Sequence, residues 1–157
     1  MKALTAMIAM MAFLNCPLYA EMDAPNILII HSYEPSYQWT GGQEEGIRNT
    51  ILGTFPKANI FIESLDSKRV PEEYIRLKQT NVILEKYSGI PFALILATDD
   101  IGLELAIGLR KALGSMAPIG FSGILETAVD SLVGDAENIT GVYEIRGFTR
   151  TIELMRL

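Results

Sequence analysis

NILIIH, from Asn26 to His31, is the stretch that decides the fold, and FALILA, from Phe92 to Ala97, repeats its character. Each is a continuous apolar run of strand length, which is typical of a central strand buried on both faces of a parallel sheet. Helical stretches alternate with such runs at short spacing, and that rhythm implies βαβ units with right-handed crossovers. We therefore predict a doubly wound, three-layer α/β domain, Rossmann-like or flavodoxin-like, with a parallel five-stranded sheet.

The remaining elements are predicted from periodicity, proline and glycine. Strands are expected at Asn26–His31, Asn59–Leu65, Phe92–Ala97, Pro118–Phe121 and Ile139–Tyr143. Helices are expected at Gly41–Gly53, from Pro71 to about Ser88, at Ile101–Leu113, at Ile124–Leu132 and over the tail from Phe148 to Leu157. The buried face of the second helix is expected to carry Tyr74, Leu77, Leu84 and Tyr87.

The first twenty residues, MKALTAMIAMMAFLNCPLYA, have the layout of a cleavable secretory signal. Lys2 precedes an apolar run that ends at Leu14, short of the about 20 residues that a membrane span needs. An uncleaved anchor or a buried first helix is the alternative. We expect export to the periplasm, and the only cysteine, Cys16, would leave with the signal.

Composition narrows the function classes. The chain has 157 residues, of which 49% are hydrophobic, and this suits one globular domain. Its formal net charge of -6 makes nucleic acid an improbable partner, because phosphate binding needs a clustered basic surface. His31 is the single histidine, which argues against a histidine-rich metal centre. We expect neither a metal nor a cofactor.

Polar residues follow the predicted strands where each one ends. Ligands of doubly wound sheets bind beyond the carboxyl ends of the strands. Aromatic rings and hydroxyls in the first loop can wall a small-molecule cleft, and carboxylates after the third strand can accept hydrogen bonds from a ligand. The candidate ligand-binding residues are Ser32, Tyr33, Trp39, Thr40, Thr98, Asp99, Asp100, Ser122 and Gly123.

Each of these groups also has a purely structural interpretation. Trp39 and one tyrosine could pack under their loop, Thr98, Asp99 or Asp100 could cap the following helix, and Ser122-Gly123 could be an ordinary turn. Lys68 and Arg69 could meet a ligand carboxylate or pair with Glu72 and Glu73. A His31–Ser32 triad is improbable, because adjacent side chains on a strand point to opposite faces.

Five segments together resemble extracytoplasmic substrate-binding-like proteins of ABC transporters, and they are similar to the periplasmic sensor region of some membrane histidine kinases and diguanylate cyclases. The segments are ILIIHSYEPSYQWT, ESLDSKR, LILATDD, PIGFSGI and NITGVYE. The resemblance implies a type I periplasmic-binding-protein-like fold of two lobes that close on a ligand. It covers only the first lobe, residues 25–145, and residues 146–157 look like the start of the crossover or of a second-lobe helix.

The resemblance implies a non-catalytic module that senses or delivers an amino acid, a purine or a similar small molecule. Its partner would be a membrane permease or a sensor output domain, in a longer protein of which this chain is a fragment, and a homodimer of single lobes is the other possibility. Two hypotheses from other classes stay open. One is an exported flavodoxin-like or hydrolase-like enzyme using Asp99 or Ser32, and the other is a protein-interaction domain.

Overall fold

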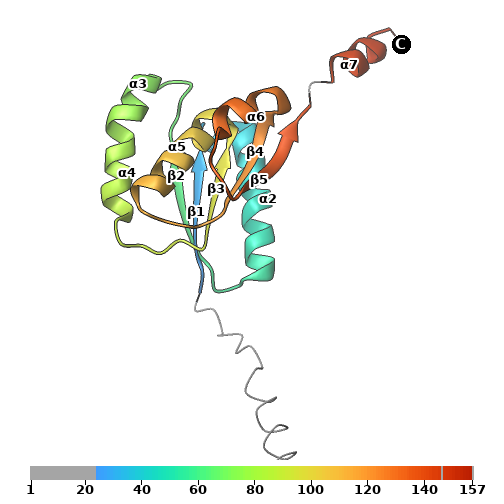
Figure 1. Ribbon diagram of the computed structural model, residues 1–157. Coiled ribbons are helices and arrows are strands. Elements are labelled where there is room, and N and C mark those ends of the chain that lie inside the picture. Colours follow the sequence, from blue (N-terminus) through green and yellow to red (C-terminus); the bar gives the residue numbers. More distant parts are fainter. Residues whose placement is uncertain (1–23, 146, 157) are drawn as a thin grey trace, which may run out of the picture.

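The computed structural model describes residues 24–145 and 147–156 (Figure 1), so the predicted signal at 1–20 lies outside the described residues. The sheet has five parallel strands in the order β2-β1-β3-β4-β5. They are β1 (Asn26–His31), β2 (Asn59–Ser64), β3 (Leu94–Thr98), β4 (Ile119–Leu125) and β5 (Ile139–Glu144). This architecture confirms the predicted three-layer α/β fold.

Helices cover both faces of the sheet (Figure 1). α2 (Gln38–Thr54) packs on one face, where Ile51 joins Ile27 and Ile29 of β1. The opposite face packs on the long α5 (Asp99–Ala112), with Leu28 and Ile30 of β1 in the same cluster. The other helical segments on that face are α3 (Glu72–Tyr74), the π-helical η2 (Ile75–Gln79), α4 (Thr80–Tyr87) and α6 (Glu126–Val133). The apolar NILIIH run is thus a strand buried on both faces.

The strand order reverses between β1 and β3. From β1 the chain crosses to β2 on one side, whereas β3, β4 and β5 follow one another on the other side. The loops after β1 and β3 therefore diverge, and in folds of this order the divergence leaves a crevice at the carboxyl edge of the sheet. The first turn of α2, which contains Trp39, and the start of α5 lie at this place.

The helix after β2 differs from its prediction. Tyr74 and Leu77, expected on the buried face, are 53% and 58% exposed. The buried side chains are Ile75, Ile83 and Tyr87. The prediction is confirmed for Tyr87, which is buried, and Leu84 packs partly buried against the core. The i→i+5 hydrogen bonds of η2 change the phase of the apolar face, so a strict 3.6-residue period is wrong at Tyr74 and Leu77.

Two helix starts also differ from expectation. α2 begins at Gln38 rather than Gly41, which places Trp39 in the first helical turn instead of in a loop. α5 begins at Asp99 rather than Ile101, and Thr98, the residue that precedes it, makes no side-chain capping hydrogen bond. Gly114 follows the end of α5 with a φ of +62°, the left-handed conformation in which glycine commonly terminates a helix.

Beyond β5 the chain forms α7 (Phe148–Leu154), which Figure 1 shows away from the sheet. Among the described residues, no helix combines the length and the apolar character that crossing a membrane requires.

Candidate functional site

Trp39, Asp99, Ser122 and Gly123 meet at the carboxyl edge of the sheet. In the register of the sheet, His31 is level with Thr98, and Thr98 is level with Ser122. The residues just beyond these positions on β1, β3 and β4 are therefore neighbours in space. Trp39 joins α2 to the start of α5, because its indole N–H donates to Asp99 Oδ1 at 3.2 Å.

Asp99 is the most unusual residue of the site. It is 6% exposed, and its backbone lies in the left-handed region with a φ of +62°, which costs free energy for a residue other than glycine. Its Oδ1 atom accepts the Trp39 hydrogen bond, but its Oδ2 atom is buried without a hydrogen-bond partner among the described residues. A buried acceptor of this kind is costly unless a ligand or water meets it.

The environment of Asp99 favours the protonated carboxyl. Burial, the largest cause, raises the pKa of Asp99 to about 6, although the Trp39 hydrogen bond opposes this rise. The negative charges of Asp100 and Glu144 add to the rise, and the positive charge of Lys68 reduces it. The Asp99 carboxyl therefore changes charge near pH 6, within the pH range in which ligand binding can be measured.

Gln43 is a site residue that the sequence analysis missed. Its Nε2 atom donates to Ser122 Oγ at 3.2 Å, while its Oε1 atom is buried without a hydrogen-bond partner among the described residues. Gln43 lies one helical turn after Trp39, so the two side chains share a face of α2. That spacing was visible in the sequence, but a helix predicted to start at Gly41 left Trp39 outside it.

Gly123 leaves space for this cluster. Its φ is +77°, and a Cβ atom built there would lie 2.8 Å from both Asp99 Oδ1 and Gln43 Nε2. Such distances are shorter than real Cβ contacts, so the position needs glycine for its backbone and for its neighbours. The start of α2 lies close to the end of β4 (Figure 1), where Gln43 donates to Ser122.

Tyr33 and Tyr37 lie beside this cluster. Their rings meet edge to face, with centroids 5.7 Å apart, and Lys68 Nζ lies 4.5 Å from the Tyr33 centroid and 4.3 Å from the Tyr37 centroid. Burial raises the pKa of Tyr33, and the charges of Asp99 and Asp100 raise it further. The charge of the Asp99 carboxyl therefore acts on Tyr33, whose ring contacts that of Tyr37.

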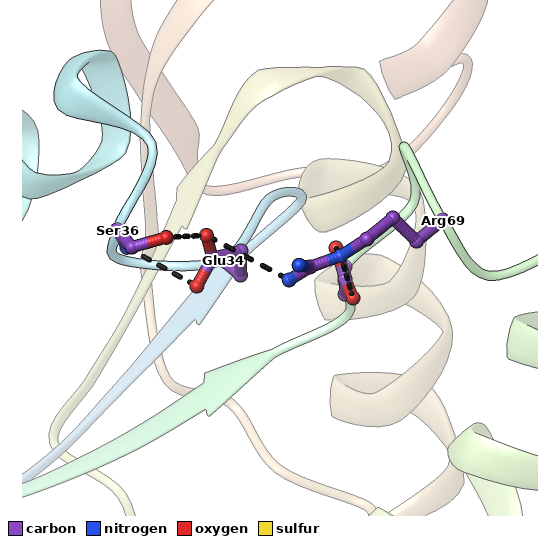
Figure 2. A network of polar contacts seen from close by, with 4 residues as sticks. Glu34, Ser36 and Arg69 are labelled. Carbon is purple, nitrogen blue, oxygen red and sulfur yellow. Dashed lines mark hydrogen bonds and ion pairs between the residues drawn. The ribbon is translucent and has the colours of Figure 1, made fainter.

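A polar network fixes the rim of the site (Figure 2). Glu34 lies between Ser36, whose backbone N–H donates to Glu34 Oε2 at 3.2 Å, and Arg69, whose Nη2 is 3.6 Å from Glu34 Oε1. Arg69 Nε also donates to both carboxylate oxygens of Asp66, at 3.0 and 2.8 Å. Arg69 thus pairs with Asp66 and Glu34, not with the Glu72 and Glu73 that the sequence analysis considered.

Two hollows lie beside the site, and their linings do not include Asp99, Ser122 or Gly123. The larger, of about 610 Å³, is lined by Tyr37, Gln38, Trp39, Gly42 and Gln43. The other, of about 300 Å³, lies over Tyr33, Tyr37, Lys68 and the network around Glu34. A further hollow of about 570 Å³ lies at the opposite edge of the sheet, between 89–93 and 113–118, and it has none of the buried polar atoms without partners found among the described residues.

Three candidate residues, Ser32, Thr40 and Thr98, are buried within the fold. Ser32 Oγ donates to the Thr98 carbonyl at 2.7 Å and accepts the Gly102 N–H at 2.7 Å, so this hydroxyl joins β1, β3 and the first turn of α5. Thr98 Oγ1 shares a 3.0 Å hydrogen bond with His31 Nδ1. Thr40 is fully buried, and its hydroxyl has no hydrogen-bond partner among the described residues. Asp100, by contrast, is exposed in the first turn of α5.

The residue types of a triad are not arranged as one. His31 Nε2 lies 3.6 Å from Glu44 Oε2, and burial lowers the pKa of His31 although Glu44 opposes the change. The Ser32 hydroxyl is engaged with Thr98 and Gly102, as described above. No hydrogen bond between the His31 and Ser32 side chains occurs in the part of the chain that the structure describes.

Comparisons with protein-family models, with curated proteins and with solved structures find no match to this chain.

Proposed function

We propose that this chain is the ligand-binding lobe of an extracytoplasmic sensor or solute-binding protein, and that it holds a small polar ligand without chemistry at the carboxyl edge of β1, β3 and β4. The observation that carries the proposal is Asp99. Its buried carboxyl lies in left-handed backbone, with one oxygen held by Trp39 and the other without a partner in the described part of the chain, and this costs stability that a structural role does not need. Strain of this kind concentrates at ligand sites.

The free groups of the site define what the ligand would offer. Among the described residues, Thr40, which follows Trp39, has a buried hydroxyl without a partner, and a hydroxyl can donate or accept. The other buried atoms near Trp39 that lack a partner there, Asp99 Oδ2 and Gln43 Oε1, are acceptors when Asp99 is ionised. A ligand that satisfies them donates hydrogen bonds, as an amine or amide does, and an acceptor left unmet costs about 1–3 kcal/mol. Trp39 is 47% exposed and offers a ring to an apolar or flat group. Amino acids and purines combine these features.

The proposal includes a second surface over the site. Tyr37 and Trp39 are 42% and 47% exposed, so a ligand seated on them would be half open to water. Small-molecule sites usually bury most of the ligand. A second lobe, as in the proteins that the sequence resembles, or a second copy of the chain would supply the missing wall and pass the signal to a permease or an output domain.

Titration of the purified protein with a panel of amino acids, purines and organic acids tests the proposal, with heat and Trp39 fluorescence as readouts. We expect one class to bind and to change the emission of Trp39. Asp99→Asn removes the charged acceptor and should weaken binding at least about tenfold, since a hydrogen bond to a charged group contributes about 1.5–3 kcal/mol. Asp130→Asn, an exposed aspartate on α6, is the matched control. A panel without binding, or equal affinity in Asp99→Asn, refutes the proposal.

The exposure of Tyr37 and Trp39 also favours a second candidate, a protein-interaction surface. Quenching of Trp39 fluorescence by a soluble quencher separates the two. Protection by a small molecule of the panel supports the ligand site, and protection that only a protein partner produces supports the interaction surface.

A further inference from the structure

The Tyr33–Tyr37 pair has the geometry of an aromatic cage. The two ring planes stand at 85° to each other, and one ammonium group, that of Lys68, lies within 4.5 Å of both ring centroids. A cation within about 6 Å of an aromatic face is attracted by the electron-rich ring, and two perpendicular rings attract it from two sides. The pair therefore holds a cation, and in this structure the cation belongs to the chain itself.

Lys68 has no carboxylate partner of its own. The adjacent Arg69 takes the carboxylates of Asp66 and Glu34, and no ion pair of Lys68 occurs within residues 24–145 and 147–156. Lys86 shows the other case. Its ammonium also lies over a ring, 5.1 Å from the Tyr87 centroid, but it is fixed by Glu63 Oε1 at 2.5 Å. Lys68 thus contacts the two rings and feels the charge of Asp99, but no ion pair among the described residues fixes it, so another cation can displace it.

We propose that Tyr33 and Tyr37 form a binding site for an organic ammonium group, that Lys68 occupies this site in the ligand-free protein, and that the amine of an incoming ligand displaces it. The inference rests on the proposed function and deepens it, because it specifies the class of ligand as cationic. The hollow of about 300 Å³ over the two rings has room for a small alkylammonium head. Asp99, Asp100 and Glu144 surround Tyr33 with negative charge.

The test uses tetramethylammonium, a cation without N–H groups, and the substitution Lys68→Met, which keeps the apolar stem and removes the charge. Binding is followed by calorimetry and by the upfield NMR shift of the methyl signal over the rings. We expect Lys68→Met to bind the probe about fivefold more tightly than the wild type. The Lys68 ammonium no longer competes for the two rings, and one exposed cation–π contact corresponds to about this factor in affinity. tert-Butanol, neutral and of similar size, should show no gain.

Two variants make the result specific. Lys86→Met removes the same charge beside a single ring, so it controls for the general attraction of a cation to a more acidic protein, and it should bind like the wild type. Tyr37→Ala in the Lys68→Met background should abolish the gain, and because Tyr37 is 42% exposed the change removes little from the core. An equal gain in Lys86→Met, or no gain in Lys68→Met, overturns the inference.

Failure here is distinguishable from failure of the proposed function. Tetramethylammonium cannot donate to Asp99 Oδ2 or Gln43 Oε1, so its binding reports on the rings and not on the acceptors. Suppose that Asp99→Asn weakens the binding of a panel ligand but Lys68→Met leaves its affinity unchanged. The proposed function would then be supported, and the inference that the ligand is cationic would be refuted.

Discussion

At the scale of single residues, Asp99 links stability to pH. Its folded-state pKa is raised to about 6 from an ordinary value of 3.8, so the folded protein binds the proton more tightly than the unfolded chain does. A carboxyl with a raised pKa costs nothing at a pH below 3.8, and the cost grows as the pH rises from about 4 to about 6 and the buried group becomes charged.

We therefore expect Asp99→Asn to be more stable than the wild type at pH 7.5, by about 1–2 kcal/mol once solvent near the loop is allowed for. Asparagine keeps the shape and tolerates left-handed backbone. The gain should vanish near pH 4, where the wild-type carboxyl is neutral. Urea unfolding at both pH values measures it, with the exposed Asp130→Asn as control. A gain that is equal at both pH values would mean that the carboxyl is not the titrating group.

At the scale of elements, two positions make contacts that no local sequence pattern predicts. Ser32 reads as a cleft hydroxyl, but it serves the first turn of α5, whose Gly102 N–H it accepts from 70 positions away. Gly102 permits this approach, since a Cβ atom there would lie 2.9 Å from the Ile30 carbonyl oxygen. Such a long-range cap replaces the local cap expected from Thr98, Asp99 or Asp100, and no local pattern encodes it.

The end of β4 carries the second such position. The register between β4 and β5 shifts between Ser122 and Ile124, so Gly123 forms a bulge that turns the backbone toward Asp99 and Gln43. A bulge with left-handed glycine is a common way to re-aim a strand next to a site.

Gly123→Ala should therefore cost more than backbone strain alone. Gly114 is a matched control, because its φ of +62° is also left-handed but a Cβ atom there meets nothing within 4 Å. We expect Gly114→Ala to lower the free energy of unfolding by about 1 kcal/mol, the usual cost of left-handed alanine, and Gly123→Ala by at least about 1 kcal/mol more. Denaturant unfolding of both variants measures the difference. Equal costs would show that the Asp99 and Gln43 side chains move aside freely.

At the scale of the whole molecule, the sequence predicts which segments are buried strands, but it does not predict in which direction the polar side chains at their ends point. Apolar runs such as NILIIH fix the strands, and parallel topology alone brings Trp39, Asp99, Ser122 and Gly123 to one edge. Whether a polar side chain at that edge faces a ligand or a neighbouring strand is set by contacts far apart in the sequence. Ser32, Thr40 and Thr98 are inward for this reason, and η2 shows the same limit for helix faces.

The two edges of the sheet are unequal, and this gives a prediction for the molecule as a whole. β2 and β5 are both edge strands, but the side chains of β2 are mostly half-buried, whereas those of β5 are mostly exposed, with Val142 at 70%. α2 packs over Ile60 and Ile62 of β2. β5 packs against α6 near Ile139, and its other described side chains are exposed. An exposed apolar edge strand is a ready site for pairing with another chain.

Hydrogen–deuterium exchange should therefore rank the strands by cover. In dilute solution we expect peptides of β1 and β3 to exchange slowest, β2 next and β5 fastest, because local opening is easiest where few buried contacts must break. Raising the protein concentration should leave β1, β2 and β3 unchanged. If β5 alone becomes protected as the concentration rises, a second copy covers this edge and the homodimer is the working form. If β5 is as protected as β2 even in dilute solution, its exposed side chains do not govern its opening, and the ranking by cover is wrong.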